Sequence, residues 1–362
     1  MRINHPPWGP LLLRIQSEEV MYRIATLSFL GCIVKSLILT RDGLQLADTP
    51  MPSIMPGEVR IEVRSVGICT TDIAIWRGEY EVELPLILGH EITGVVHESS
   101  VPELEPGTPV TTEIDVYCGR CWFCRHGQPH HCPERKTLGV TTDGGLAEYV
   151  SVPSDLVHAL PPSVDTVTGV FTEPLASAIE TVRRAEAEKD EVVVVLGTGK
   201  IGLLVAQAYD AYGAEVYLVG RNQWKLGLAR RIGLRYAINT NSHDWKDQIL
   251  DVTSGVGPRV VVEATGTPDG MAMALNLVRP GGIIAVKSIH GATFPVSVAE
   301  IVRKEITLIG SRSGPFDVAL DMLDKGRIEV KSLISAQFAL DDGAKAFEYA
   351  SRPEATKVVI NI

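Results

Sequence analysis

Residues 192–202 read VVVVLGTGKIG, and most of the fold prediction depends on them. Four valines and a leucine form an unbroken apolar run, which is typical of a buried strand in a parallel sheet. The glycine pattern G-x-G-x-x-G follows at once and opens a segment with helical spacing. Gly197 permits the tight turn, Gly199 lets a pyrophosphate approach the backbone, and Gly202 permits close helix–strand packing. The stretch therefore predicts a dinucleotide site at a strand–helix junction.

The whole motif is a candidate for cofactor binding, because the free N–H groups at a helix N-terminus attract phosphate. A glycine-rich turn that serves packing alone is the alternative, and the order of strand, motif, helix and strand argues against it. The motif residues predicted to bind cofactor are Gly197, Thr198, Gly199, Lys200, Ile201 and Gly202.

The end of the next predicted strand, EVYLVGRN (215–222), bears on which dinucleotide binds. NAD sites usually place an acidic residue there, about 20 residues after the motif, to hold the ribose hydroxyls. Here the strand ends in Gly220, Arg221 and Asn222, and Glu215 lies at its opposite end. Because an arginine can pair with a 2′-phosphate, we predict NADP(H) in preference to NAD(H). The alternative is that Arg221 is an ordinary solvated residue.

Strands and helices alternate on both sides of this stretch, which predicts a doubly wound parallel sheet covered on both faces. Further buried strands are expected at 259–266 and 281–288, with helices between them. Pro174 is expected at the first helical position of the segment that begins PLASAIETV, where its missing N–H costs nothing. We therefore predict a Rossmann domain over residues 181–325.

The remaining chain has a different pattern of apolar residues. Residues 33–115 contain short alternating runs broken by Pro and Gly, such as GEVRIEVRSVGI (57–68), which predict a mainly antiparallel β domain. The terminal ATKVVINI (355–362) returns to this strand-like pattern. We predict that residues 32–180 and 326–362 form one catalytic domain, with residues 1–31 as an extension of unknown role.

Composition excludes several classes of protein. A chain of 362 residues is long for one core, and its net charge of −10 has no compensating basic run. That balance argues against nucleic-acid or anionic-membrane partners. No apolar run is long enough to span a membrane, and Arg14 and Arg23 interrupt the apolar N-terminal runs. We therefore expect a cytoplasmic protein with a small-molecule substrate.

The stretch CGRCWFCRHGQPHHC (118–132) predicts a metal site. Its spacing is C-x2-C-x2-C-x7-C, and four thiolates suit a closed tetrahedral zinc that leaves no position for substrate. Such crowding fits a reducing compartment better than a disulfide framework. The histidines of the stretch are expected to be loop residues, because the thiolates already fill the zinc shell. The predicted structural zinc ligands, within a lobe spanning 115–135, are Cys118, Cys121, Cys124 and Cys132.

With these motifs in place, the chain resembles the zinc-dependent medium-chain alcohol and polyol dehydrogenases over residues 33–362. The resemblance rests on six segments in the family's order: GICTTD (67–72), GHEITG (89–94), the four-cysteine lobe, DGGLAEYV (143–150), TEPLA (172–176) and GTGKIG (197–202). It implies a GroES-like catalytic domain interrupted by the Rossmann domain, with the active site in the cleft between them. It also implies a dimer or tetramer of identical chains.

The resemblance further implies a catalytic zinc with three protein ligands and an open position. Cys69 and His90 would be two ligands, and either Glu91 or Glu173 the third. Asp72 would orient His90. Each residue alone has an ordinary structural explanation, and only their occurrence together in family order favours a metal site.

The proton route departs from the family pattern. Thr71, two residues after Cys69, is placed to accept the alcohol's proton, but Ala74 stands where many members carry a relay histidine. Thr70 also replaces a usual glycine. We expect a different proton route through cofactor ribose and water. The predicted catalytic residues are Cys69, Thr71, His90, Glu91 and Glu173.

Weaker cofactor contacts are carried over from the segments EATG (263–266), KSIH (287–290), GSRS (310–313) and ATKVV (355–359). They are Thr265, Gly266, Ser288, Ile289, Ser311, Arg312 and Lys357, the last as a basic group for the pyrophosphate.

The leading hypothesis is a zinc-dependent, NADP(H)-preferring alcohol dehydrogenase or ketone reductase. A polyol or sugar dehydrogenase is the first alternative, and a reductase without catalytic zinc is the second. Outside enzymes, the cysteine lobe could belong to a zinc-dependent interaction module, against which the dinucleotide motif argues.

Overall fold

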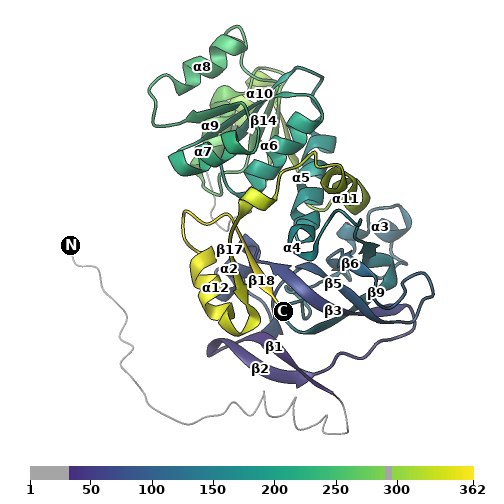
Figure 1. The fold of residues 1–362 in the computed structure, drawn as a ribbon. Helices are drawn as coiled ribbons and strands as arrows, with labels where there is room; N and C mark the ends of the chain where they lie inside the picture. The colour runs from purple at the N-terminus through teal and green to yellow at the C-terminus, as the bar shows by residue number, and fades with distance from the viewer. Residues whose placement is uncertain (1–31, 290–295) are drawn as a thin grey trace.

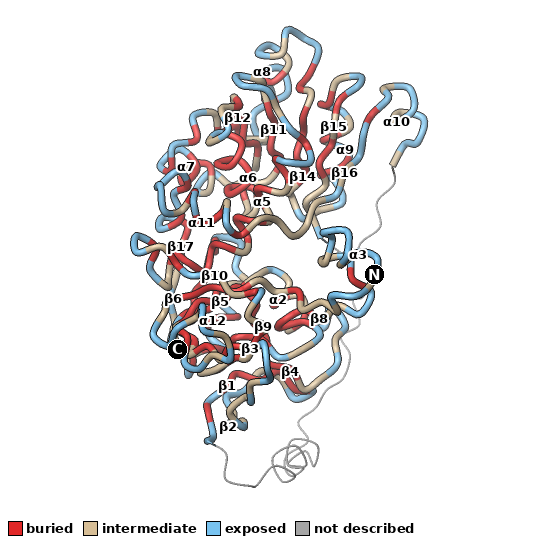
Figure 2. The backbone as a smooth tube through the Cα atoms, turned by 90° about the vertical axis from the view of Figure 1, so that its right-hand side faces the viewer, coloured by how far each residue is buried: buried red, intermediate tan, exposed pale blue. Residues whose placement is uncertain are grey.

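The computed structural model describes residues 32–289 and 296–362. Two sheet systems lie one above the other in Figure 1, joined by a long helix, α5 (Thr172–Arg184). The predicted N-terminal extension and the end of the KSIH loop, residue 290, lie outside the described residues. In the view of Figure 2, buried backbone follows the strands of both systems, so each has its own core.

The lower system is mainly antiparallel, as predicted. Its larger sheet runs β10-β6-β5-β3-β18-β17, with β9 added on β3, and its smaller sheet runs β2-β1-β4. The alternating segment 57–68 supplies the central strand β3, whose alternate residues Val59, Ile61 and Val63 are at most 1% exposed. The strands are β1 (Ile33–Thr40), β2 (Gly43–Pro50), β3 (Glu58–Gly67), β4 (Leu86–Ile87), β5 (Glu91–Ser99), β6 (Pro109–Thr112), β9 (Tyr149–Pro153), β10 (Val157–Ala159), β17 (Ile334–Ala339) and β18 (Lys357–Asn361).

The end of the chain completes this lower system. β18 pairs antiparallel with β3, so residues about 300 positions apart in sequence share one sheet. In Figure 1 the yellow C-terminal segments accordingly lie against the purple N-terminal strands. The lower system also holds β7 (Asp115–Val116), β8 (Lys136–Thr137), α2 (Thr70–Trp76), α3 (Trp122–Arg125), α4 (Thr166–Gly169) and α12 (Gly343–Ala350), with the single-turn helices η1 (Pro129–His131), η2 (Ser154–Leu156), η3 (Lys331–Leu333) and η4 (Leu340–Asp342).

The upper system is one parallel sheet in the order β13-β12-β11-β14-β15-β16. The first strand in sequence lies at the centre and the order reverses beside it, which is the arrangement of a Rossmann fold. The predicted fold class is therefore confirmed here. The elements are β11 (Val192–Leu196), β12 (Glu215–Gly220), β13 (Tyr236–Asn239), β14 (Val260–Glu263), β15 (Ile283–Val286), β16 (Thr307–Gly310), α6 (Lys200–Ala211), α7 (Gln223–Arg231), α8 (Trp245–Val252), α9 (Asp269–Leu277), α10 (Val298–Lys304) and α11 (Phe316–Asp324).

The junction of β11 and α6 requires glycines. Gly197 has φ of +113°, and a Cβ on it would lie 2.2 Å from the carbonyl oxygen of Ala264. A Cβ on Gly202 would lie 2.0 Å from the carbonyl oxygen of Gly197. Gly199 forms the N-cap of α6 and has no neighbour within 4 Å of where its Cβ would be, so its backbone faces open space.

One local prediction is wrong. Pro174 is the third residue of α5 rather than the first, because the helix begins at Thr172. The physical reason is that the first N–H groups of a helix have no partner within it, so proline is tolerated throughout the first turn.

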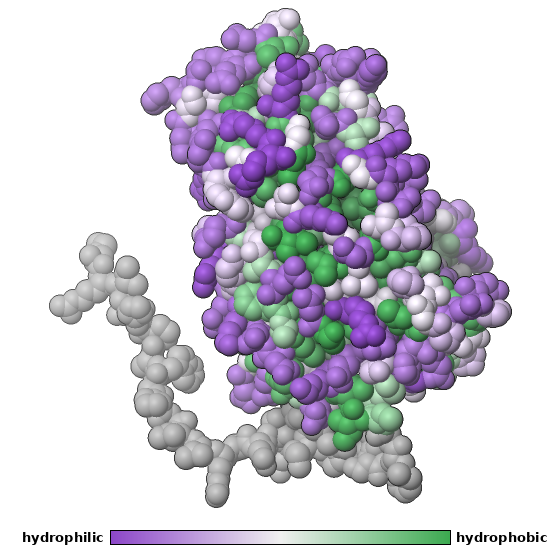
Figure 3. Space-filling view, in the orientation of Figure 1, coloured by the Kyte–Doolittle hydropathy of each residue, from purple (hydrophilic) through white to green (hydrophobic). Residues whose placement is uncertain are grey.

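On the face drawn in Figure 3, hydrophilic residues surround scattered apolar patches over both systems. No helix within residues 32–289 and 296–362 is long and apolar enough to cross a membrane.

Candidate active site and metal centres

His90 lies at the start of β5, 4% exposed, with Nδ1 3.3 Å from Oδ1 of Asp72. Asp72 is fixed in turn, because it accepts hydrogen bonds from the backbone N–H groups of Cys69 (2.8 Å) and Gly89 (3.3 Å). Burial disfavours the charged imidazole, but the charges of Asp72 and Cys69 outweigh it and raise the pKa of His90 well above its ordinary value. The negative surroundings that favour imidazolium would equally favour a metal cation.

Cys69 forms the N-cap of α2, so its position is set by the start of that helix. Its Sγ lies 3.8 Å from the hydroxyl oxygen of Thr71. The structure therefore brings Cys69, Thr71 and His90 together, with Asp72 beneath them. A thiolate and an imidazole at one point are donors that zinc prefers.

The two candidate glutamates differ in their surroundings. Glu91 is 1% exposed and forms an ion pair with Lys357, which is equally buried. Glu173, on the first turn of α5, makes no ion pair or hydrogen bond within the described part of the chain. Burial raises the pKa of Glu173, and the charge of Glu91 adds to this, while His90 and nearby lysines oppose it. Of the two carboxylates, that of Glu173 is therefore the one whose oxygen atoms remain available to bind a metal.

The four-cysteine cluster is compact. The Sγ atoms of Cys118, Cys121, Cys124 and Cys132 all lie within 4.8 Å of one another. Backbone N–H groups of Arg120 and Cys121 lower the pKa of Cys118 to about 7, whereas burial and the neighbouring Cys121 raise the pKa of Cys124 to about 12. Among the described residues no other group of three or more metal-ligating side chains is gathered as tightly. This donor set fits a closed tetrahedral zinc. His126 instead lies with Nδ1 2.6 Å from the Trp122 carbonyl oxygen.

Most predicted cofactor residues lie at the carboxyl ends of the parallel strands, where ligands of such sheets bind. Thr198 packs against Gly220, because a Cβ on Gly220 would lie 2.5 Å from its methyl group. Gly266 donates its N–H to the Ser288 hydroxyl at 2.8 Å. Thr265 donates to the buried Glu263. Arg221 and Ile289 are exposed, and Asn222 accepts from the N–H of Lys225 as the N-cap of α7.

Four predicted cofactor residues are bonded to other groups of the protein. Ser311 shares a hydrogen bond with Thr181 at 2.8 Å, and Arg312 donates to Asp115 at 2.9 Å. Lys200, in the glycine motif, donates to the carbonyl oxygen of Ile68 at 2.9 Å, beside Cys69. Lys357 is engaged with Glu91. Arg312 and Lys200 therefore join the two sheet systems, whereas the Lys357–Glu91 pair lies within the lower one.

Two polar residues that position this site were not predicted from the sequence. Asp115 accepts from Arg312, Ser313 and Thr137, so it connects the cysteine lobe to the segment after β16. Lys287 donates to backbone and hydroxyl oxygens of Ser177 and to the carbonyl oxygen of Ser311 at 2.7–3.1 Å. A lysine directly after a buried strand was a usable signal for Lys287. Asp115 and its distant partners left none.

A cavity of about 340 Å³ opens beside Glu173. Its walls are the segment 113–117, the cysteine lobe, the outer face of α5 and the residues that precede α11. Its size is at the lower end of the roughly 300–1,000 Å³ usual for small-molecule sites. Polar side chains dominate the lining: Glu113, Asp115, Tyr117, His130, Glu173, Glu180, Arg183 and Ser313.

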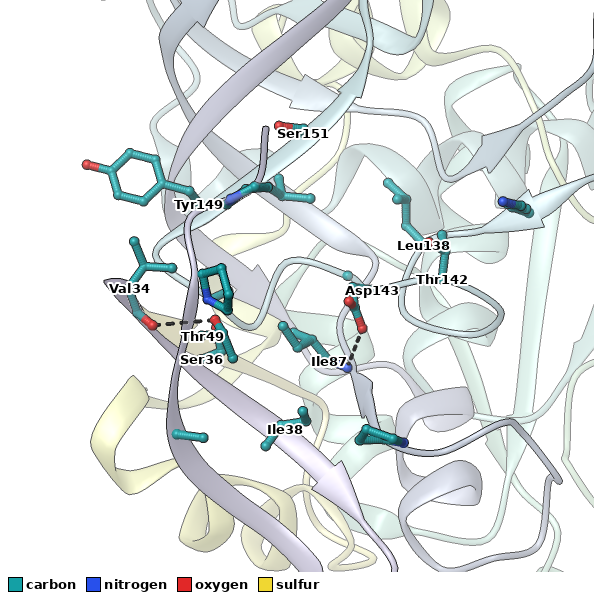
Figure 4. A pocket seen from close by; sticks show the side chains of 18 of the residues that line it. Val34, Ser36, Ile38, Thr49, Ile87, Leu138, Thr142, Asp143, Tyr149 and Ser151 are labelled. Carbon is teal, nitrogen blue, oxygen red and sulfur yellow. Dashed lines mark hydrogen bonds between the residues drawn. The ribbon is translucent and has the colours of Figure 1, made fainter. Parts of the chain in front are cut away.

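A second cavity, of about 400 Å³, lies within the lower domain between β1, β2, β9 and the 136–144 loop (Figure 4). Some of its polar groups are already bonded, since Ser36 and Thr49 are 2.6 Å apart and Asp143 accepts from the N–H of Ile87 at 3.1 Å. The buried Ser151 hydroxyl has no partner within the described residues. No predicted site residue lines this cavity. Of the predicted site residues, Glu173 lines the smaller cavity, and Cys69 and His90 line neither.

Comparison with known proteins agrees with this architecture. The family model described as the alcohol dehydrogenase GroES-like domain matches residues 55–162, and that of the zinc-binding dehydrogenases matches residues 201–325. A sorbitol dehydrogenase of Halalkalibacterium halodurans is 32% identical over 339 residues, covering 90% of this chain and 99% of the relative.

Two solved structures extend the likeness. A putative zinc-binding dehydrogenase from Sinorhizobium meliloti 1021, bound to NADP, superposes with a TM-score of 0.86 at 28% identity, covering 91% of this chain and 100% of the other. An alcohol dehydrogenase from Escherichia coli CFT073, complexed with NADH, gives 0.85 at 28% identity, with 92% and 100% covered.

Fold and comparisons together define a zinc-binding oxidoreductase with a GroES-like domain and a Rossmann domain. The chain belongs to the zinc-dependent medium-chain dehydrogenases, the family of alcohol and polyol dehydrogenases that act on CH–OH groups. The predicted family and enzyme class are therefore confirmed.

Proposed function

We propose that this protein is a zinc-dependent, NADP(H)-preferring alcohol dehydrogenase that interconverts a secondary alcohol of a polyol or sugar and the corresponding ketone. The observation that carries the proposal is the site formed by Cys69 and His90, whose charge acts on Glu173, together with the polar cavity that opens beside Glu173. Its carboxylates, arginine and tyrosine suit a substrate with many hydroxyl groups better than a simple apolar alcohol. The likeness to a sorbitol dehydrogenase supports the same substrate class.

Cys69, His90 and Glu173 would hold the catalytic zinc, and Glu91 is the alternative third ligand. When bound, zinc supplies a Lewis acid that polarises the substrate oxygen. Asp72 keeps His90 oriented through Nδ1, which leaves Nε2 as the ligand atom. Glu173 is favoured over Glu91 because Glu91 would have to leave its buried partner Lys357. The four cysteines of the lobe would hold a second, structural zinc.

The glycine motif would bind the cofactor's pyrophosphate at the N-terminus of α6. When bound, the nicotinamide would supply the acceptor for the substrate's C–H hydride, while the alcohol's O–H proton would leave through the protein's own groups and a ketone would remain. Arg221 is exposed at the end of β12 with no acidic residue beside it, which supports recognition of a 2′-phosphate. The E. coli neighbour with NADH shows that the family fold also accepts the other cofactor.

Thr71 would accept the alcohol's proton, since its hydroxyl lies beside Cys69. Ala74 cannot carry the proton further, so the route would continue through the cofactor ribose and water. We further propose a cytoplasmic homo-oligomer, a dimer or tetramer, because four zinc-bound thiolates require a reducing compartment and members of the family commonly assemble.

The test is steady-state dehydrogenase activity with hexitols, pentitols, simple secondary alcohols and their ketones, each with NADP(H) and NAD(H). We expect the highest kcat/KM for a polyol with NADP⁺, and loss of activity after strong chelation with recovery on adding zinc. Activity that persists when the only zinc left is the one bound by the four lobe cysteines would refute the proposal of a catalytic zinc.

A further inference from the structure

The wall that α5 contributes to the cavity beside Glu173 carries polar groups at a regular helical spacing. Glu173 and Glu180 are seven residues apart, so they lie nearly on one face of the helix and about 10 Å apart along its axis. Arg183 follows three residues later, and its Nη1 is 3.7 Å from the Glu180 carboxylate. All three side chains line the same cavity.

This spacing matches the length of a linear polyol. An extended chain advances about 1.2 Å per bond, so the two terminal oxygens of a hexitol are about 8 Å apart, and a hydrogen bond adds about 3 Å. A six-carbon chain whose reacting end lies at Glu173 would therefore bring its far hydroxyl to Glu180. A three- or four-carbon chain would end well short of it.

The charges of the cavity favour a neutral substrate over an anionic one. Glu180 retains 24% of its side-chain exposure and Arg183 retains 60%, so both can exchange water for a ligand. Across the cavity, the Glu113 carboxylate lies 2.9 Å from His158 Nε2, and Asp115 is neutralised by Arg312 and Arg135. With Glu173 and Glu180 included, acidic groups outnumber the basic ones on these walls. A phosphate at the far end would meet the Glu180 carboxylate together with the Arg183 guanidinium that is paired with it.

We propose that Glu180 and Arg183 bind the distal hydroxyl groups of an unphosphorylated linear polyol of five or six carbons and so set the enzyme's preference for chain length. Glu180 accepts a hydrogen bond from the terminal hydroxyl and Arg183 donates one to its neighbour. These are specificity residues, since neither lies at the reacting carbon. The inference rests on the proposed function, because it takes Glu173 as the reacting end of the cavity.

The experiment compares KM and kcat for sorbitol and for butane-2,3-diol in the wild-type chain, E180Q, E180D and R183M. The matched control is E186Q, which removes the same charge from an exposed residue just beyond α5 that does not line the cavity. We expect E180Q and R183M to raise the ratio of the sorbitol KM to the butanediol KM by about tenfold, as loss of a hydrogen bond to a charged group does. E186Q should leave the ratio unchanged.

Sorbitol 6-phosphate provides an independent readout. The wild-type chain should use it less well than sorbitol, and E180Q should reduce that discrimination by removing the repelling charge. An E180Q ratio within twofold of the wild type would overturn the proposal, as would a wild-type preference for the phosphate. Unchanged thermal midpoints in E180Q and E180D exclude misfolding as the cause. If the wild-type chain oxidised no alcohol at all, the proposed function itself would fail, and that result is distinct from an unchanged ratio.

Discussion

The carboxylate of Glu91 and the ammonium of Lys357 form an ion pair in which each side chain is only 1% exposed. The two residues are 266 positions apart, and they join β5 to β18 beside the predicted catalytic metal. The ammonium also lies 5.4 Å from the centre of the Phe171 ring. One pair therefore connects the end of the chain to the residue that follows His90.

Breaking this pair should destabilise the protein strongly, because it leaves a buried charge without a partner. We expect K357M to lower the free energy of unfolding by about 3–5 kcal/mol. The double variant E91Q/K357M should lose much less, since both charges are then absent. Urea unfolding of the four members of the cycle measures the coupling. A loss in the double variant equal to the sum of the losses in E91Q and K357M would show that the pair contributes nothing.

Arg221 should determine the preference between the two dinucleotides. We expect R221A to raise the KM for NADP⁺ at least about tenfold, because a charge-assisted contact to the 2′-phosphate is lost. The KM for NAD⁺ should hardly change. R231A, an exposed arginine at the far end of helix α7, is the matched control for loss of a positive charge. A wild-type preference for NAD⁺, or an equal effect of R221A on both cofactors, would contradict the assignment.

Lys287 should make stability depend on pH above neutrality. Burial lowers its pKa to about 8, although the charges of Glu173 and Glu180 oppose this. Below pH 8 the lysine is charged in both the folded and unfolded states, and the cost of burying that charge is fully present. Between about pH 8 and 10.5 the folded chain releases the proton first, so the free energy of unfolding should rise by up to about 3 kcal/mol.

K287M removes this contribution. The difference in unfolding free energy between the wild-type chain and K287M, followed by urea titration from pH 7 to 10, should grow in favour of the wild type. A difference that stays constant over this window would show that Lys287 keeps an ordinary pKa.

The pair formed by Asp115 and Arg312 should couple the cysteine lobe to the cofactor domain. Asp115 is 6% exposed and binds groups from both sides of the cavity. We expect R312M to raise KM for the polyol and for the cofactor several-fold, with kcat affected less. Without this bond the cysteine lobe and the cofactor domain are no longer held at a fixed separation. R120M, which removes an exposed pairing with Glu134 on the same lobe, is the control. Unchanged KM values in R312M would exclude this role.

Much of the architecture could be predicted because its signals are local. Residues that are adjacent in sequence determine each of three features: the turn at Gly197, the buried run 192–196 and the four cysteines within fifteen residues. The helix at 172–184 was recognisable as well, although its first turn begins two residues before Pro174. In these segments the sequence shows directly the spacing of the apolar residues, the glycines that allow unusual backbone angles and the spacing of the metal ligands.

The contacts that arrange the site were not predictable in the same way. Arg312 and Asp115 are 197 residues apart, and neither belongs to a pattern that indicates the other. Lys357 was assigned to the pyrophosphate by family order, whereas the structure places it against Glu91. Lys200 reads as part of a glycine loop, yet its ammonium contacts the other domain. The partner of a long charged side chain depends on which charges the tertiary packing buries, and that packing is not apparent from nearby sequence.

Zinc content and polyol oxidation, measured together on the wild-type chain and on C69S, test most directly whether the chemistry depends on a metal at Cys69 and His90. We predict about two zinc ions per chain in the active wild type, and about one in C69S, whose four-cysteine lobe stays closed. C69S should keep its fold and lose at least about a thousandfold in kcat/KM, as expected when the Lewis acid is removed. An active C69S, or a fully active wild type with one zinc, would contradict the proposed site.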